Sequence, residues 1–174
     1  SALAYGVNSV NYFTYNLPEN PPDGEEYTYA MANDVIAYNA VKTVNNEISK
    51  FHYVLKEYDW MATKYYGTSK DGLFDKLAQN TSLPNIISVE TSNAGIVSHM
   101  YDFEKALDGY WLVNTTNPED NLSNTVSVTF DSVFTEAIVF VDGQRELVNL
   151  KSGVYTAELE AGEGVFVIPL KIEQ

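Results

Sequence analysis

Acidic side chains are the most abundant groups in this chain that could do chemistry. The sequence has 24 Asp and Glu against 10 Lys and Arg. Glu25 and Glu26 are adjacent, and Asp102 and Glu104 lie two positions apart. Paired carboxylates perform acid–base chemistry when burial pushes their pKa values apart. In so acidic a chain such pairs arise by chance, so we interpret both pairs as solvated surface groups.

Other residue types with catalytic or metal-binding potential are scarce. Cys is absent, and the two histidines, His52 and His99, are far apart in the sequence. A zinc site needs three or four ligands with a recognisable spacing, and no nucleophile elbow, metalloprotease or EF-hand pattern occurs. The sequence therefore predicts no catalytic residue, no metal site and no cofactor in this chain. An autonomous hydrolase that uses the acidic loop 19–26 is disfavoured, because no base, nucleophile and orienting group occur together.

Aromatic residues offer a second kind of chemistry, the binding of sugar rings. The chain has 13 Tyr and 2 Trp, and aromatic faces suit both sugars and β-sandwich cores. Tyr110 and Trp111, with Tyr65 and Tyr66, are the candidates for a stacking platform. Successive side chains of a strand face opposite ways, so we expect either Tyr110 or Trp111 to be exposed if their strand is half-buried.

The charge balance excludes some partners. The formal net charge is −14, which opposes binding to nucleic acid and to anionic membrane surfaces. No run approaches the roughly 20 apolar residues of a membrane span. The absence of cysteine fits the bacterial cytosol and does not exclude secretion.

The first third of the chain predicts a strand, a loop and a helix. Residues 1–15 are rich in aromatic and β-branched types and predict a buried strand. Residues 16–33 contain three Pro and several acids, which predict an irregular loop. Asn33 or Asp34 then caps a helix, whose apolar stripe has alternating spacings of four and three: Ala37, Val41, Val44, Ile48, Phe51 and Leu55.

From about residue 59 onward the sequence predicts short strands separated by turns. Strands are expected at 60–66, 86–89, 95–101, 110–113, 126–130, 137–141, 145–150, 155–159 and 165–168. Asp108 and Asp142 each precede a Gly and predict turns, while Pro169 should lie at the end of a strand or on a sheet edge. The predicted fold is mainly β with one long helix: an antiparallel β-sandwich over residues 59–174, preceded by a strand–loop–helix unit over residues 1–58.

This order of parts resembles a known family. YGVNSVNYFTY, an acidic and Pro-rich loop, and a helix with a V-x-x-V-N-x-E-I run at 41–48 are similar to the last strand and helix of a (β/α)8 barrel in β-galactosidase-like retaining glycoside hydrolases. NTVSVTF, EAIVFVDG and LEAGEGVFVIPL resemble the C-terminal β-sandwich that follows the barrel in such enzymes. The resemblance covers both ends of the chain and is thin between about 67 and 108.

The resemblance implies a double-displacement mechanism that uses two Glu at the ends of barrel strands four and seven. This chain would start at strand eight, so neither catalytic Glu can be assigned here. Barrel active sites lie at the carboxyl ends of the strands, which would place Tyr15 and Asn16 at the rim of the sugar site in the intact enzyme.

The expected function is therefore a non-catalytic C-terminal region of a glycoside hydrolase, and the alternative is a carbohydrate-binding module. Carbohydrate is the expected partner of the intact enzyme. A lone strand at 1–15 would leave its backbone N–H and C=O groups unpaired. We therefore also expect a homo-oligomer, in the form of an exchanged dimer.

Overall fold

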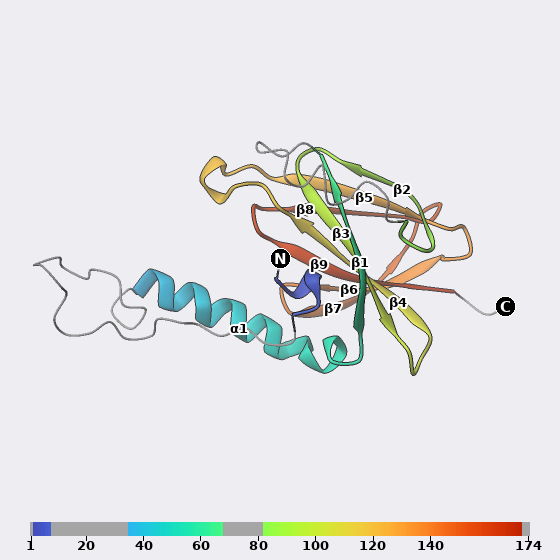
Figure 1. Cartoon of the computed structure of the whole chain (residues 1–174), viewed down its shortest axis with the longest axis horizontal. Helices are drawn as coiled ribbons and strands as arrows, with labels where there is room; N and C mark the ends of the chain where they lie inside the picture. Colours follow the sequence, from blue (N-terminus) through green and yellow to red (C-terminus); the bar gives the residue numbers. More distant parts are fainter. Residues whose placement is uncertain (1, 8–34, 68–81, 172–174) are drawn as a thin grey trace, which may run out of the picture.

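The computed structural model describes residues 2–7, 35–67 and 82–171, and these form mainly strands with one long helix (Figure 1). In chain order the elements are η1 (Ala2–Tyr5), α1 (Val35–Leu55), β1 (Asp59–Tyr66), β2 (Ile86–Thr91), β3 (Gly95–Asp102), β4 (Leu107–Asn114), η3 (Pro118–Asp120), β5 (Asn124–Phe130), β6 (Glu136–Val141), β7 (Gln144–Asn149), β8 (Val154–Leu159) and β9 (Gly164–Leu170). The predicted fold class is confirmed: two antiparallel sheets preceded by a helix.

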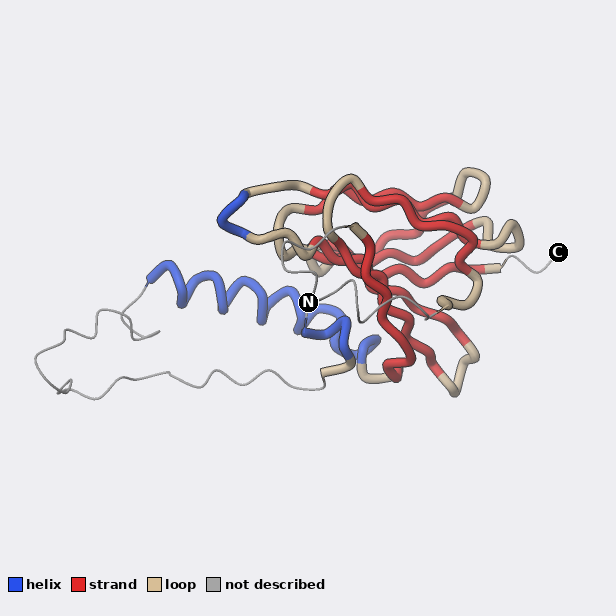
Figure 2. The backbone as a smooth tube through the Cα atoms, turned by 45° about the horizontal axis from the view of Figure 1, so that its top comes forward, coloured by secondary structure: helices blue, strands red, loops and turns tan. Residues whose placement is uncertain are grey.

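The strands form two sheets that pack face to face (Figure 2). The larger sheet has six strands in the order β1-β3-β4-β9-β6-β7, and the smaller has three in the order β2-β5-β8. Period-two alternation explains the smaller sheet, because Val126, Val128 and Phe130 of β5 are buried while Thr125 is exposed.

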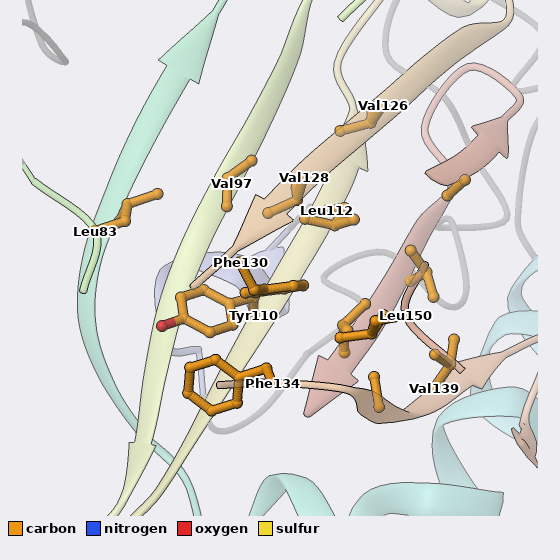
Figure 3. Close-up of a cluster of buried hydrophobic side chains, with 14 of the residues drawn as sticks. Leu83, Val97, Tyr110, Leu112, Val126, Val128, Phe130, Phe134, Val139 and Leu150 are labelled. Atoms are coloured by element: carbon orange, nitrogen blue, oxygen red, sulfur yellow. The ribbon is translucent and has the colours of Figure 1, made fainter. Parts of the chain in front are cut away.

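The main core lies between the two sheets (Figure 3). Val97 of β3 and Leu112 of β4 point toward Val126 and Val128 of β5 in that view. These side chains are at most 1% exposed. The aliphatic and aromatic residues at alternating positions of the two sheets thus pack together as one hydrophobic core.

A second core covers the other face of the larger sheet. It joins residues of β3, β4, β6 and β9 to α1 and η1, and its buried members are Ala4, Phe51, Tyr58, Ile96, Met100, Trp111, Val113, Phe140, Phe166 and Ile168. The predicted boundary at residue 58 lies between the end of α1 at Leu55 and the start of β1 at Asp59, and this cluster contains side chains from both sides of it.

The helix is anchored at its C-terminal end. Phe51 is buried, whereas Val44, about two helical turns earlier on the same stripe, is 47% exposed. Val41 and Ile48 are half-buried. In Figures 1 and 2 the N-terminal part of α1 extends away from the sheets. The predicted stripe is therefore real, but the sheet covers only its last turns.

The prediction of a strand over residues 1–15 is wrong for its first residues. Ala2–Tyr5 form the 3-10 helix η1, and the N–H of Gly6 donates to the Leu3 carbonyl at 3.0 Å. Ala and Leu are strong helix formers, which favours a turn of helix here. The remainder of the predicted strand, residues 8–15, and the loop 16–33 lie outside the described residues.

The prediction of a turn at Asp108 and Gly109 is also wrong, because both lie inside β4. A Cβ at Gly109 would lie 2.4 Å from Cζ of Phe166 and 2.8 Å from Cε1 of Tyr58. The glycine is therefore needed for the close approach of two aromatic rings rather than for a turn. Pro169 is placed as predicted, near the end of β9 and beyond the last β9 residue paired with β4.

Candidate binding groove

A groove of about 450 Å³ opens between α1 and one end of the larger sheet. Five separate parts of the chain line it: η1, the last half of α1, β4, the β6–β7 hairpin and the β8–β9 hairpin. Volumes of this size are typical of sites that hold a small ligand or a few side chains of a partner.

The floor of the groove is aromatic. Phe51 of α1 stacks on Phe140 of β6 with ring centroids 5.7 Å apart, and it lies 6.1 Å from Trp111 of β4. Trp111 is only 6% exposed, and its indole Nε1–H has no hydrogen-bond partner among the residues that the structure describes.

The rim of the groove is acidic. Four carboxylates are among the lining residues, from Glu47, Asp142, Glu158 and Glu163. Glu163 also accepts the Glu160 N–H at 2.8 Å, which orders the β8–β9 turn. None of the described residues that line the groove is Lys, Arg or His. The groove therefore combines an apolar floor with a negative rim.

Two tight turns hold this rim in place. The predicted hairpin at Asp142 and Gly143 is confirmed, with φ values of 50° and 68°. Positive φ at both central residues is the geometry of a type I′ turn, for which Asp-Gly is a preferred sequence. The β8–β9 turn uses Gly162 at φ 83°. Both turns bring their acids to the end of the sheet that faces α1.

A second group of polar side chains, away from the groove, packs against Tyr110 of the main core. His99 Nε2 is 2.7 Å from Asp108 Oδ1, and Asn85 Nδ2 donates to Asp108 Oδ2 at 2.7 Å. The His99 ring stacks on Tyr110 with centroids 5.3 Å apart, and the Tyr110 hydroxyl donates to the Pro84 carbonyl. These contacts clamp β3 and β4 to the segment that leads into β2.

This cluster lacks the parts of a catalytic site. Nucleophilic catalysis needs a nucleophile in hydrogen-bond contact with the base, and in the described part of the chain no hydroxyl is in such contact with His99. Burial, and then the charge of Asp108, raise the pKa of Tyr110 far above its ordinary value, although a hydrogen bond from Asn85 opposes the shift. The Tyr110 phenol stays protonated at neutral pH and cannot act as a base.

The sequence-predicted site residues have different fates. Tyr15, Asn16 and the Glu25–Glu26 pair lie outside the described residues. Tyr110 and Trp111 are 0% and 6% exposed, because sheets or helices cover both faces of β4. Neither ring therefore forms an exposed platform, although Trp111 lines the groove from below. Tyr65 and Tyr66 are half-buried. Asp102, predicted to be solvated, is buried instead.

The described residues offer neither a metal site nor a membrane-spanning helix. No group of three or more His, Asp or Glu side chains there could hold a metal ion. No helix in that part of the chain has the length and apolar character needed to span a membrane.

Comparison with known proteins gives no match: no family model, no curated protein and no solved structure is similar to this chain.

Proposed function

We propose that this chain is the non-catalytic C-terminal region of a (β/α)8-barrel glycoside hydrolase, in which α1 and the sandwich form an accessory body beside the barrel. The observation that carries the proposal is the partly covered stripe of α1. An amphipathic helix normally buries its whole apolar face, yet Val44 is 47% exposed while Phe51 is 7% exposed. A helix shared between a sandwich and a barrel would use the uncovered half of this stripe against the barrel.

The resemblance of residues 41–48 and of the closing strand to such enzymes supports the same role. The sandwich has a hydrophobic core on each face of its larger sheet, and such a well-packed domain could support the barrel beside it. In this role the chain supplies packing surface, and the two catalytic Glu belong to the barrel.

A hydrolysis assay tests the non-catalytic part of the proposal. The chain is incubated with a panel of nitrophenyl glycosides, and no release of nitrophenol above a protein-free blank is expected. A preparation in which Glu47 and Glu163 are both changed to Gln controls for contaminating enzyme. Turnover that is lost in this variant and present in the original chain would refute the proposal.

The gene tests the glycoside hydrolase part. The reading frame upstream of the codon for Ser1 is expected to encode a barrel of about 200 residues or more. That region should end its fourth and seventh strands with Glu. A start codon directly before Ser1 would contradict this part of the proposal.

A carbohydrate-binding module is the second candidate, and one observation favours it. The groove brings Trp111 and Phe140 together with carboxylates, and carboxylates accept hydrogen bonds from sugar hydroxyls. Calorimetric titration with a panel of oligosaccharides separates the two candidates. A saturable signal that is lost on changing Glu158 and Glu163 to Gln would favour the binding module.

The exchanged dimer stays a prediction, because residues 8–15 lie outside the described part of the chain. Light scattering over a range of protein concentrations tests it, and a monomer at all concentrations would contradict it.

A further inference from the structure

The groove combines an apolar floor with an acidic rim, and these two features together define the chemistry of an occupant. We infer that the groove binds a short segment of the neighbouring barrel that carries apolar side chains flanked by Lys or Arg. This inference rests on the proposed docking role, and it names the chemistry of the segment that docks.

The apolar part of the inference follows from the floor. Phe51 stacks on Phe140 and makes a tilted contact with Trp111, and all three rings line the groove. Val44 and Ile48 of α1 line the adjacent wall, and Val44 is 47% exposed. An aliphatic or aromatic side chain seated here would cover this surface and gain the free energy of apolar burial.

The cationic part follows from the rim. Four of the lining residues are acids and none is basic among those described. Two cations lie next to lining residues. Lys50 lies beside Gly143, and Arg145 is paired with Phe140 across the β6–β7 hairpin. The four acids still outnumber these two cations, so the rim favours a positive segment.

A second copy of this chain is disfavoured as the occupant, because its net charge of −14 repels the acidic rim.

The test uses the full chain labelled with ¹⁵N and three synthetic peptides. The first is acetyl-Lys-Leu-Phe-Lys-Leu-Lys-amide. The second replaces every Lys by Glu, and the third replaces every Leu and Phe by Ser. The chain has 2 Trp, so its spectrum contains two indole N–H signals. Trp111 lines the groove, whereas Trp60 donates to Thr63 away from it. A Trp60→Phe variant assigns the two signals.

The first peptide is expected to shift the Trp111 indole signal saturably and to leave the Trp60 signal unchanged. The Glu and Ser peptides are expected to produce no saturable shift. A triple variant with Glu47→Gln, Glu158→Gln and Glu163→Gln should raise the Kd of the first peptide about tenfold. The matched control combines Glu90→Gln, Glu104→Gln and Glu146→Gln, which makes the same change in net charge outside the groove and should leave the Kd within about twofold. Val44→Lys should also weaken binding, because it places a cation on the exposed wall.

Several results would overturn the inference: no saturable shift of Trp111, equal binding of the Glu or Ser peptide, or equal effects of the two triple variants. A Trp111 signal that changes with protein concentration alone would show that a second copy occupies the groove, and this also overturns it. None of these readouts measures hydrolysis, so a failure here is distinguishable from a failure of the proposed non-catalytic role.

Discussion

At the residue scale, the buried carboxylate of Asp102 organises the connection between β3 and β4. It is 1% exposed. Its Oδ1 accepts the backbone N–H groups of Glu104 and Lys105 at 2.9 and 3.0 Å, and its Oδ2 accepts from Lys105 Nζ at 2.9 Å. Burial alone would raise its pKa, but the hydrogen bonds from Lys105 and Glu104 outweigh burial and hold the pKa below its usual value.

Asp102→Asn is expected to lower the free energy of unfolding by about 1 kcal/mol at neutral pH. A carboxyl whose pKa is depressed in the folded state contributes stability above its unfolded pKa of about 3.9, and this contribution is lost as the pH falls through the folded value. The difference between the two proteins should therefore shrink below about pH 4. Urea unfolding across this pH range measures it. Glu104→Gln, on an exposed side chain, is the control, and a difference independent of pH would contradict the assignment.

The environments of Asp102 and Asp108 could not be predicted from their residue types. Asp102 is buried, although its hydrogen-bond partners Glu104 and Lys105 are close in the sequence. Asp108 is half-buried, and its partners His99 and Asn85 become its neighbours only in the folded sheet. Asn114 and Asn124 are 0% exposed and donate to backbone carbonyls of distant segments. Short polar residues in a sequence indicate turns, and nothing local separates these buried ones from exposed ones.

At the element scale, the β6–β7 turn and α1 depend on each other. A Cβ at Gly143 would lie 2.5 Å from Lys50 Cδ and 3.3 Å from Glu47 Cα, both on the helix. At Gly162 a Cβ would meet nothing within 4 Å, although φ is also positive there. The two glycines thus share a backbone conformation and differ in their surroundings.

Gly143→Ala should therefore destabilise the protein more than Gly162→Ala does. The Gly162 variant is expected to lose about 1 kcal/mol, the usual effect of a side chain in the left-handed region. The Gly143 variant should lose about 1 kcal/mol more, because helix and turn must also separate. Chemical denaturation of both variants measures the difference, and equal losses would show that the helix does not press on the turn.

The anchoring of α1 gives a second prediction at this scale. Phe51→Ala should cost about 3 kcal/mol, because it leaves a cavity against Phe140 and Trp111. Val44→Ala, at the exposed position of the same stripe, should cost about 0.5 kcal/mol or less. Thermal unfolding followed by circular dichroism compares them. A large loss in the Val44 variant would mean that this part of the stripe is covered in solution.

Most of the elements could be predicted from local pattern. Each segment carries its own local signal. These signals are the period-two alternation in β5, the 3.6-residue stripe of α1 and the Asp142–Gly143 turn sequence. The interior character of β4 could not be predicted in this way. Tyr110 is buried between the two sheets, and Trp111, on the other face, is also buried because η1 and α1 cover the outer face of the larger sheet.

At the scale of the whole molecule, negative charge opposes compaction. The net charge of −14 repels itself in the folded state. Raising NaCl from about 10 mM to about 150 mM shortens the screening length from roughly 30 Å to roughly 8 Å. The thermal midpoint should rise by about 3 °C at neutral pH. Near the sequence pI of about 4.3 the same addition should have little effect, and a falling midpoint at neutral pH would contradict the prediction.

The groove also belongs to this scale, which is why the sequence alone does not reveal it. Its lining comes from η1, α1 and two turns that are separated by most of the chain. The local signals at the groove are the apolar stripe of α1 and Asp-Gly at 142–143, and they predict a helix and a hairpin rather than a site. The positions of its four acids become meaningful only when the helix is placed on the sheet.

The second core has a consequence for how this protein can be divided. Trp111, Phe140 and Phe166 are shielded from water by Ala4, Phe51 and Tyr58, all of which precede β1. Cutting the chain at residue 58 would expose an apolar aromatic surface on the larger sheet, which favours aggregation. A truncated or fused version that keeps the strands therefore has to keep the helix with them.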